Sequence, residues 1–184
     1  MKNGAECYSR FLSGDKKAIE EIIRDYKDGL IFYLFSIVGD MHKAEELAID
    51  TFIILFSEQP KFKGEGAFKT WVYSIGRHLA LDHRRRIKRV YEVPLEEAKD
   101  ISDEESIEQS YIADEERIRL RRTINKLKPE YSQVLYLIYF EGFDHDETAK
   151  IMNKSKKQTI DLLYSAKKAL KKLLEKEGYN YDGL

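Results

Sequence analysis

Two helix-start signatures follow each other closely near the end of this chain. In the first, Asp144 precedes Glu147 by three residues, and in the second Ser155 precedes Gln158 by three. With this spacing, the earlier side chain accepts a hydrogen bond from a backbone N–H of the first turn, while the later one reaches back to the cap residue. The sequence therefore predicts two successive helices separated by a tight turn, which is the order of a helix-turn-helix motif.

The predicted second helix of this motif, over 156–177, has two distinct faces. At helical spacing, one face is apolar: Ile160, Leu163, Ala166, Leu170, Leu173 and Leu174. The opposite face is mostly polar: Lys157, Gln158, Asp161, Ser165, Lys168 and Lys172. A recognition helix needs one face for its own domain and another for the major groove. An ordinary amphipathic bundle helix shows the same division, but the paired signatures and the tight turn favour DNA binding.

Composition predicts an all-α protein. Glycine and proline are scarce, at 10 and 3 residues, and the single cysteine excludes an internal disulfide. The longest apolar run, 30–38, is interrupted by Ser36 and is too short to span a bilayer. With no signal-peptide pattern at the start, these features predict a soluble cytoplasmic protein.

The net charge of −1 conceals a segregation of charge along the chain. Residues 1–91 carry a net +3, residues 92–116 a net −10 and residues 117–184 a net +6. Five of the six residues over 84–89 are basic. A charge run is commonly a solvated face, but separation by segment favours two basic parts that face phosphates.

Helix-start residues and breakers divide the chain into two helical domains. In the first, Asp15 and Asp40 are expected to begin helices over 15–38 and 41–57, and a long helix over 68–90 follows a glycine-containing loop over 61–67. The second has helices over 114–126 and from Pro129 to Phe140 before the helix-turn-helix. We expect a domain over 1–92, a flexible acidic linker over 93–113 and a domain over 114–184.

Several ordered motifs together resemble an extracytoplasmic-function (ECF) sigma factor, the small two-domain class that directs bacterial RNA polymerase to promoters. In the first domain they are Gly39-Asp40, Ala44-Glu45-Glu46-Leu47, Asp50-Thr51-Phe52, Phe68 to Arg77, Leu79-Ala80 and Asp82-His83. Further along they are Val93 to Glu97, Leu127-Lys128-Pro129, Tyr139 to Gly142 and the helix-turn-helix. The likeness covers roughly residues 10–176, and the ordered set is more specific than any one piece.

The resemblance implies that the chain is a dissociable subunit of core RNA polymerase, binding its β′ and β subunits, with no active site of its own. The residues it assigns to a coiled coil of the β′ subunit are Glu46, Leu47, Asp50 and Phe52. Leu47 and Phe52 are expected to serve the domain core as well. The linker would thread the polymerase cleft, where its negative charge could imitate nucleic acid, or it is simply a soluble spacer.

The resemblance also implies two promoter-reading surfaces. The residues expected at the −10 element are Lys61, Phe62, Lys63, Gly64, Lys69, Thr70, Tyr73, Ser74, Arg77, His78, Arg84, Arg85 and Arg86. Within that set, the loop would capture a flipped base and the three arginines would hold duplex phosphates. Those expected at the −35 element are Ser155, Lys156, Lys157, Gln158, Asp161, Ser165 and Lys168. An anti-sigma factor is a further implied partner, whereas a cofactor, a metal and a small-molecule substrate are not expected.

The sequence departs from the family pattern at three informative places. Ile49 stands where a glutamine is usual on the polymerase-binding helix, and His78 replaces a usual asparagine. Asp161 faces outward on the recognition helix, where it would repel a phosphate or accept a hydrogen bond from cytosine N4. These changes point to altered polymerase contacts and promoter preference.

Two other function classes remain as alternatives. His78, Asp82 and His83 could bind a metal or transfer protons, but a metal site needs three or four converging ligands and the sequence offers no others nearby. A stand-alone helix-turn-helix regulator would explain residues 117–184 without explaining the first domain. Mixing the protein with core polymerase distinguishes that regulator from a sigma factor.

Overall fold

A computed structural model of the chain describes residues 4–62, 67–91 and 115–178. Over these ranges the secondary structure is helical throughout, which confirms the predicted all-α class. The predicted linker over 93–113 lies outside the described residues. All seven helices predicted from the sequence are present with ends close to those expected.

Over its described residues, the first domain contains four α-helices and one π-helical turn. These are α1 (Gly4–Leu12), α2 (Lys17–Val38), α3 (Met41–Ile53), η1 (Ile54–Glu58) and α4 (Phe68–Tyr91). The expected start signals are used: Asp40 accepts a hydrogen bond from the Lys43 N–H at 2.8 Å, and Asp15 accepts one from the Lys17 N–H at 3.0 Å.

Helix α1 was not anticipated by the sequence patterns. It packs on α2 and α4, where Tyr8 lies against the rings of Phe68 and Trp71, both at 5.5 Å between ring centres. The Tyr8 hydroxyl donates to the carbonyl of Pro60 at 2.9 Å. An aromatic core therefore holds α1 and the start of the 61–67 segment together.

The second domain contains the predicted helix-turn-helix. Its elements are α6 (Glu115–Asn125), α7 (Pro129–Leu135), η2 (Tyr136–Phe140), α8 (His145–Met152) and α9 (Lys156–Lys176). Both capping boxes are formed, by Asp144 with Glu147 and by Ser155 with Gln158. Between them, Asn153 adopts a left-handed conformation with φ of 53°, which makes the tight turn.

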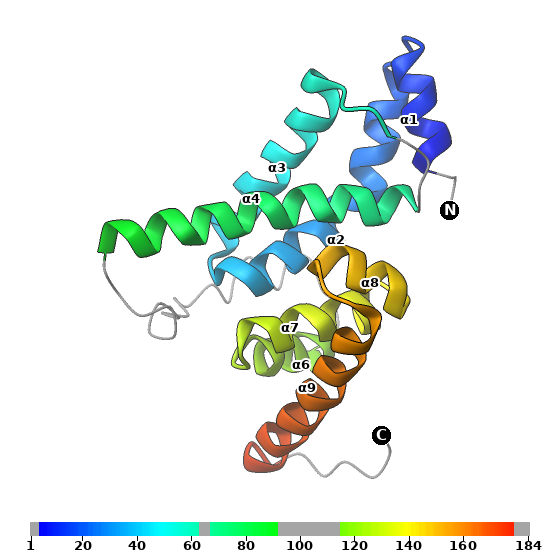
Figure 1. Cartoon of the computed structure of the whole chain (residues 1–184). Helices are drawn as coiled ribbons and strands as arrows, with labels where there is room; N and C mark the ends of the chain where they lie inside the picture. The colour runs from blue at the N-terminus through cyan, green and yellow to red at the C-terminus, as the bar shows by residue number, and fades with distance from the viewer. Residues whose placement is uncertain (1–3, 63–66, 92–114, 179–184) are drawn as a thin grey trace.

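The two domains pack against each other. Figure 1 shows α8 lying against the long helix α4, while α7 lies against α2. Arg121 of α6 places its guanidinium 4.1 Å from the centre of the Phe32 ring on α2. The sequence left open whether the domains associate in the free chain, and in this structure they do.

Candidate nucleic-acid and protein interfaces

The polar residues predicted for the −10 element do share one face of α4, and the second domain covers that face. The Lys69 ammonium lies 2.9 Å from a carboxylate oxygen of Glu141 and donates to the Glu141 carbonyl at 2.7 Å. The Tyr73 hydroxyl donates to the same carboxylate at 2.5 Å, and Thr70 donates to Glu147 at 3.1 Å. Carboxylates of the second domain thus occupy a predicted DNA-binding surface.

Burial on this face is deepest at Tyr73, which is 0% exposed. Its ring makes an edge contact with Phe143 at 5.1 Å. Burial, and then the neighbouring Glu141 carboxylate, raise the pKa of the Tyr73 phenol well above its ordinary value. Tyr73 and Thr70 are therefore packed between the domains, where single-stranded DNA has no access to them.

Further along α4, Arg77 also contacts the second domain. Its Nε donates to the side-chain oxygen of Gln133 at 3.2 Å. Ser74 donates to the carbonyl of Thr70 at 2.7 Å, a bond within the helix that leaves its hydroxyl oxygen able to accept. His78 is exposed and lies 3.2 Å from Asp82. Within the described ranges, no group of three or more metal-ligating side chains gathers around them.

The basic run at the end of α4 is only partly available to solvent. Arg84 is half-buried, and burial lowers the pKa of its guanidinium. Arg85 pairs with Asp82 at 2.6 Å, whereas Arg86 is exposed. Of the three arginines predicted to hold phosphates, one is therefore half-buried and another is already paired within the chain.

The predicted base-capturing loop is described only at its ends. Lys61 is exposed, and Phe62 is half-buried against Trp71, with 5.2 Å between ring centres. Lys63 and Gly64 lie outside the described residues. Phe68 is buried in the core.

On α9, the polar face predicted to read the −35 element is exposed, but not all its side chains are free. Ser155 and Gln158 bond to each other's backbone N–H groups as a cap, and Lys156 pairs with Asp146 at 2.7 Å. Lys157, Asp161 and Lys168 are exposed, and Ser165 is half-buried. These three exposed side chains therefore remain the main candidates for the −35 contact.

Two apolar side chains also lie on the exposed surface of α9. Ile160 is 44% exposed, so its assignment to the buried stripe was wrong. The buried stripe is instead Thr159, Leu163, Ala166, Leu170 and Leu174. Tyr164 is 72% exposed and sits between Lys157, Asp161 and Lys168 on the outward face. The sequence places Tyr164 on the side of the helix opposite Ala166 and Leu170, which predicts an exposed side chain, but Tyr164 was not singled out.

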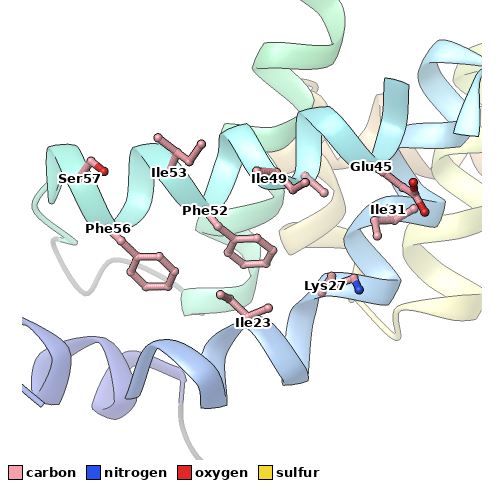
Figure 2. Close-up of a pocket in the computed structure, with 10 residues that line it drawn as sticks. Ile23, Lys27, Ile31, Glu45, Ile49, Phe52, Ile53, Phe56 and Ser57 are labelled. Carbon is pink, nitrogen blue, oxygen red and sulfur yellow. The ribbon is translucent and has the colours of Figure 1, made fainter. Parts of the chain in front are cut away.

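An apolar groove of about 520 Å³ separates α2 from α3 and η1. Figure 2 shows Ile23, Lys27 and Ile31 on α2 facing the rings of Phe52 and Phe56 across it. Ile49 and Ile53 line it and are 59% and 53% exposed. An open groove with this apolar lining suits an amphipathic helix of a partner protein.

The four residues predicted to contact polymerase lie on α3 in two different settings. Glu46 and Asp50 are exposed, with Glu46 paired to Lys43 at 2.7 Å. Leu47 and Phe52 are buried, which confirms their expected place in the domain core, and Phe52 also lines the groove. Ile49 was singled out in the sequence only as a departure from the family pattern and Ile53 was not singled out, although their one-turn spacing places both along the groove.

Comparison with known proteins follows this division into two domains. The family described as Sigma-70 region 2 matches residues 22–90, and the family described as Sigma-70, region 4 matches residues 117–173. Similar curated proteins include ECF sigma factors. The chain belongs to the ECF sigma factors. Its first domain is thus sigma region 2, and its second is sigma region 4.

The most informative relatives are similar along nearly their whole length. RNA polymerase sigma factor YlaC of Bacillus subtilis is 28% identical over 163 residues, covering 88% of this chain and 94% of that protein. The RNA polymerase sigma-H factor of Pseudomonas aeruginosa is 27% identical, covering 92% of this chain and 93% of its own.

Two solved structures share the fold of this sigma factor. One is CnrH in complex with the cytosolic domain of CnrY, with a TM-score of 0.65, 19% identity and coverage of 95% and 96% of the two chains. The other is the sigma factor RpoE with the anti-sigma factor NepR from Bartonella quintana, with a TM-score of 0.71, 19% identity and coverage of 86% and 98%. Among the residues described for this chain, none of the helices has the length and apolarity to cross a membrane.

Proposed function

We propose that this alternative sigma factor binds core RNA polymerase through the groove between α2 and α3, and reads the promoter with one face of α4 and one face of α9. The observation that carries the proposal is the pairing of a region 2 groove with a complete region 4 helix-turn-helix in one chain. A stand-alone regulator needs the second feature and has no use for the first.

For the polymerase, the proposed contact is the open side of α3. Ile49 and Ile53 would enter an apolar seam on a partner helix, while Glu46 and Asp50 at its edge would meet charged groups. Burying exposed apolar side chains contributes roughly 25 cal/mol per Å². The apolar groove would therefore supply most of the affinity for polymerase, and the charged residues at its rim would fix the orientation of the partner helix.

For the promoter, the proposed −35 contact is the outward face of α9. Lys157 and Lys168 would approach phosphates, and Asp161 would accept from a base edge. At the −10 element, Lys69, Thr70, Tyr73 and Arg77 would hold single-stranded DNA. These side chains are covered by region 4 in the free chain, so the domains must separate before −10 recognition.

The same exposed surfaces suit an anti-sigma factor, a second proposed partner. A helix of such a protein in the α2–α3 groove would exclude polymerase by direct competition. Function in transcription also places the proposed site of action in the cytoplasm, alongside polymerase and DNA.

The test is complex formation with purified bacterial core polymerase, followed by initiation on a promoter that the complex selects. We expect co-migration on a size-exclusion column and transcripts that are lost when either promoter element is substituted. Binding to duplex DNA without any association with core polymerase would instead identify a stand-alone regulator.

A further inference from the structure

We infer that region 4 is an intramolecular inhibitor of region 2, with Glu141 held against the surface of α4 that reads the −10 element. This inference rests on the proposed −10 role of α4. Lys69, Thr70, Tyr73 and Arg77 each bond to a region 4 side chain or carbonyl. Single-stranded DNA and region 4 cannot occupy these groups at once.

The charges at this contact match those expected in the complex with DNA, which the contact between the domains would exclude. Glu141 and Glu147 present carboxylates to Lys69 and Thr70, where DNA would present phosphate oxygens. The Glu141 side chain is 11% exposed, so its charge is held close to Lys69 with little screening. A positive side chain that binds DNA is thereby neutralised from within the chain.

The backbone of α2 is also shaped for this contact. A Cβ atom at Gly29 would lie 2.5 Å from the Tyr73 hydroxyl and 2.6 Å from each oxygen of the Glu141 carboxylate. Real Cβ atoms do not approach other atoms so closely, so a side chain at this position would force the Tyr73 hydroxyl or the Glu141 carboxylate to move from the place it has here. Glycine inside a helix is less favourable than alanine, and closure of the domains offers a reason for it here.

Apolar and cationic contacts extend the interface beyond the carboxylates. Phe143 packs edge-on against Tyr73, and the Lys69 ammonium lies 4.7 Å from the centre of the Phe143 ring. Arg121 lies over Phe32 of α2 while also facing the rings of Tyr136 and Phe140 in its own domain. The contact therefore joins region 4 to both α2 and α4.

The closed form can be measured by the distance between spin labels on the full-length chain. The single buried Cys7 would be replaced by alanine, and labels attached at Lys88→Cys on α4 and Lys171→Cys on α9, both exposed. We expect a dominant narrow distance population in this background, with a minor open population of roughly one molecule in ten. Glu141→Ala should shift the dominant population to a broad, longer distribution, whereas Glu175→Ala, an exposed glutamate of the same domain, should not.

Gly29→Ala tests the interface from its other side. It favours helix formation in α2 while blocking the approach of Glu141, so it should open the domains even if Glu141→Ala fails to fold. Both variants should bind the non-template −10 strand of a promoter mapped with core polymerase about tenfold more tightly than the parent chain. That ratio is expected when roughly one parent molecule in ten is open.

Equal distance distributions in the parent, Glu141→Ala and Gly29→Ala chains would overturn the inference, as would equal affinity for the −10 strand. If the chain still supported promoter-specific initiation with core polymerase in that case, the inhibitory contact would be refuted and the proposed function would stand. If no variant supported initiation although the distances changed as expected, the proposed function would fail and the closed contact would remain.

Discussion

Ile49 and Ile53 lie one helical turn apart on α3, and both are more than half exposed along the same groove. Exposed isoleucines at this spacing form a continuous apolar edge beside the buried Phe52. Ile49 also occupies the position where the family resemblance leads one to expect glutamine. The groove is thus more apolar here than the sequence comparison suggested.

Ile53→Lys should weaken binding to core polymerase about tenfold. Loss of an apolar contact at the centre of an interface commonly costs more than about 1 kcal/mol, and 1.4 kcal/mol is tenfold in affinity. Titration of labelled core polymerase measures the change. Ile87→Lys, which replaces an exposed isoleucine on α4, is the matched control and should leave core affinity unchanged. Equal losses in both variants would show that the groove is not the contact.

Lys157→Glu combined with Lys168→Glu should impair initiation that depends on the −35 element while core binding stays intact. Both lysines are exposed on α9, so reversing their charges repels phosphates without disturbing the buried stripe. In vitro transcription and a core-binding titration are run on the same preparations. A parallel loss of core binding would refute the assignment of separate tasks to the two domains.

Tyr164 should contribute to base preference through thymine methyl groups in the −35 element. Apolar side chains in the major groove favour the C5 methyl, and one buried methyl is worth about 0.8 kcal/mol, or roughly fourfold in affinity. Replacing −35 thymines by uracil should therefore weaken parent holoenzyme binding about fourfold. The Tyr164→Ala holoenzyme should not distinguish the two bases. Equal sensitivity in both proteins would exclude this contact.

Lys69 and Glu141 should show measurable energetic coupling across the domain interface. Lys69→Glu alone places two carboxylates together and should separate the domains, whereas Lys69→Glu with Glu141→Lys restores opposite charges. For residues in contact, such cycles give about 0.5–3 kcal/mol. Denaturant unfolding of the four chains measures the coupling, and additive effects would indicate that the ion pair does not help to hold the domains together.

Acidification should destabilise region 2 through His83. Burial, and then the nearby Lys43 charge, lower the pKa of its imidazole below the ordinary 6.5. The unfolded chain therefore binds a proton more readily, and stability is lost as the pH falls through about 6.5. His83→Gln should reduce this fall in the urea midpoint between pH 7 and pH 5. His42→Gln, at an exposed histidine, should retain it.

Local sequence signals were sufficient for the helices from α2 onward, including the helix-turn-helix. Asp40, Asp144 and Ser155 act as caps because their side chains satisfy free N–H groups within one turn, a relationship visible in sequence spacing. Helix α1 was missed because its stability comes from distant aromatic partners such as Phe68 and Trp71. Periodicity within a segment carries no information about such partners.

The residues of the −10 face were grouped correctly on one side of α4, but their surroundings could not be read from the sequence. Amphipathic spacing predicted a polar surface and could not show that Glu141 would cover it. Likewise, Ile160 was placed in the buried stripe because helical angle alone does not locate the edge of a packed interface. A glycine inside a strongly helical segment, such as Gly29, indicates a close contact at that position. The sequence could not show that this contact is made by the other domain.

Mapping transcript starts on genomic DNA, with purified core polymerase and this chain, shows whether the chain directs initiation at specific promoters. The account predicts a small set of starts absent with core polymerase alone, each preceded by a shared pair of −10 and −35 motifs. At limiting chain concentration Ile53→Lys should reduce these starts about tenfold, because the chain binds the polymerase more weakly. A pattern of starts identical with and without the chain would contradict the account.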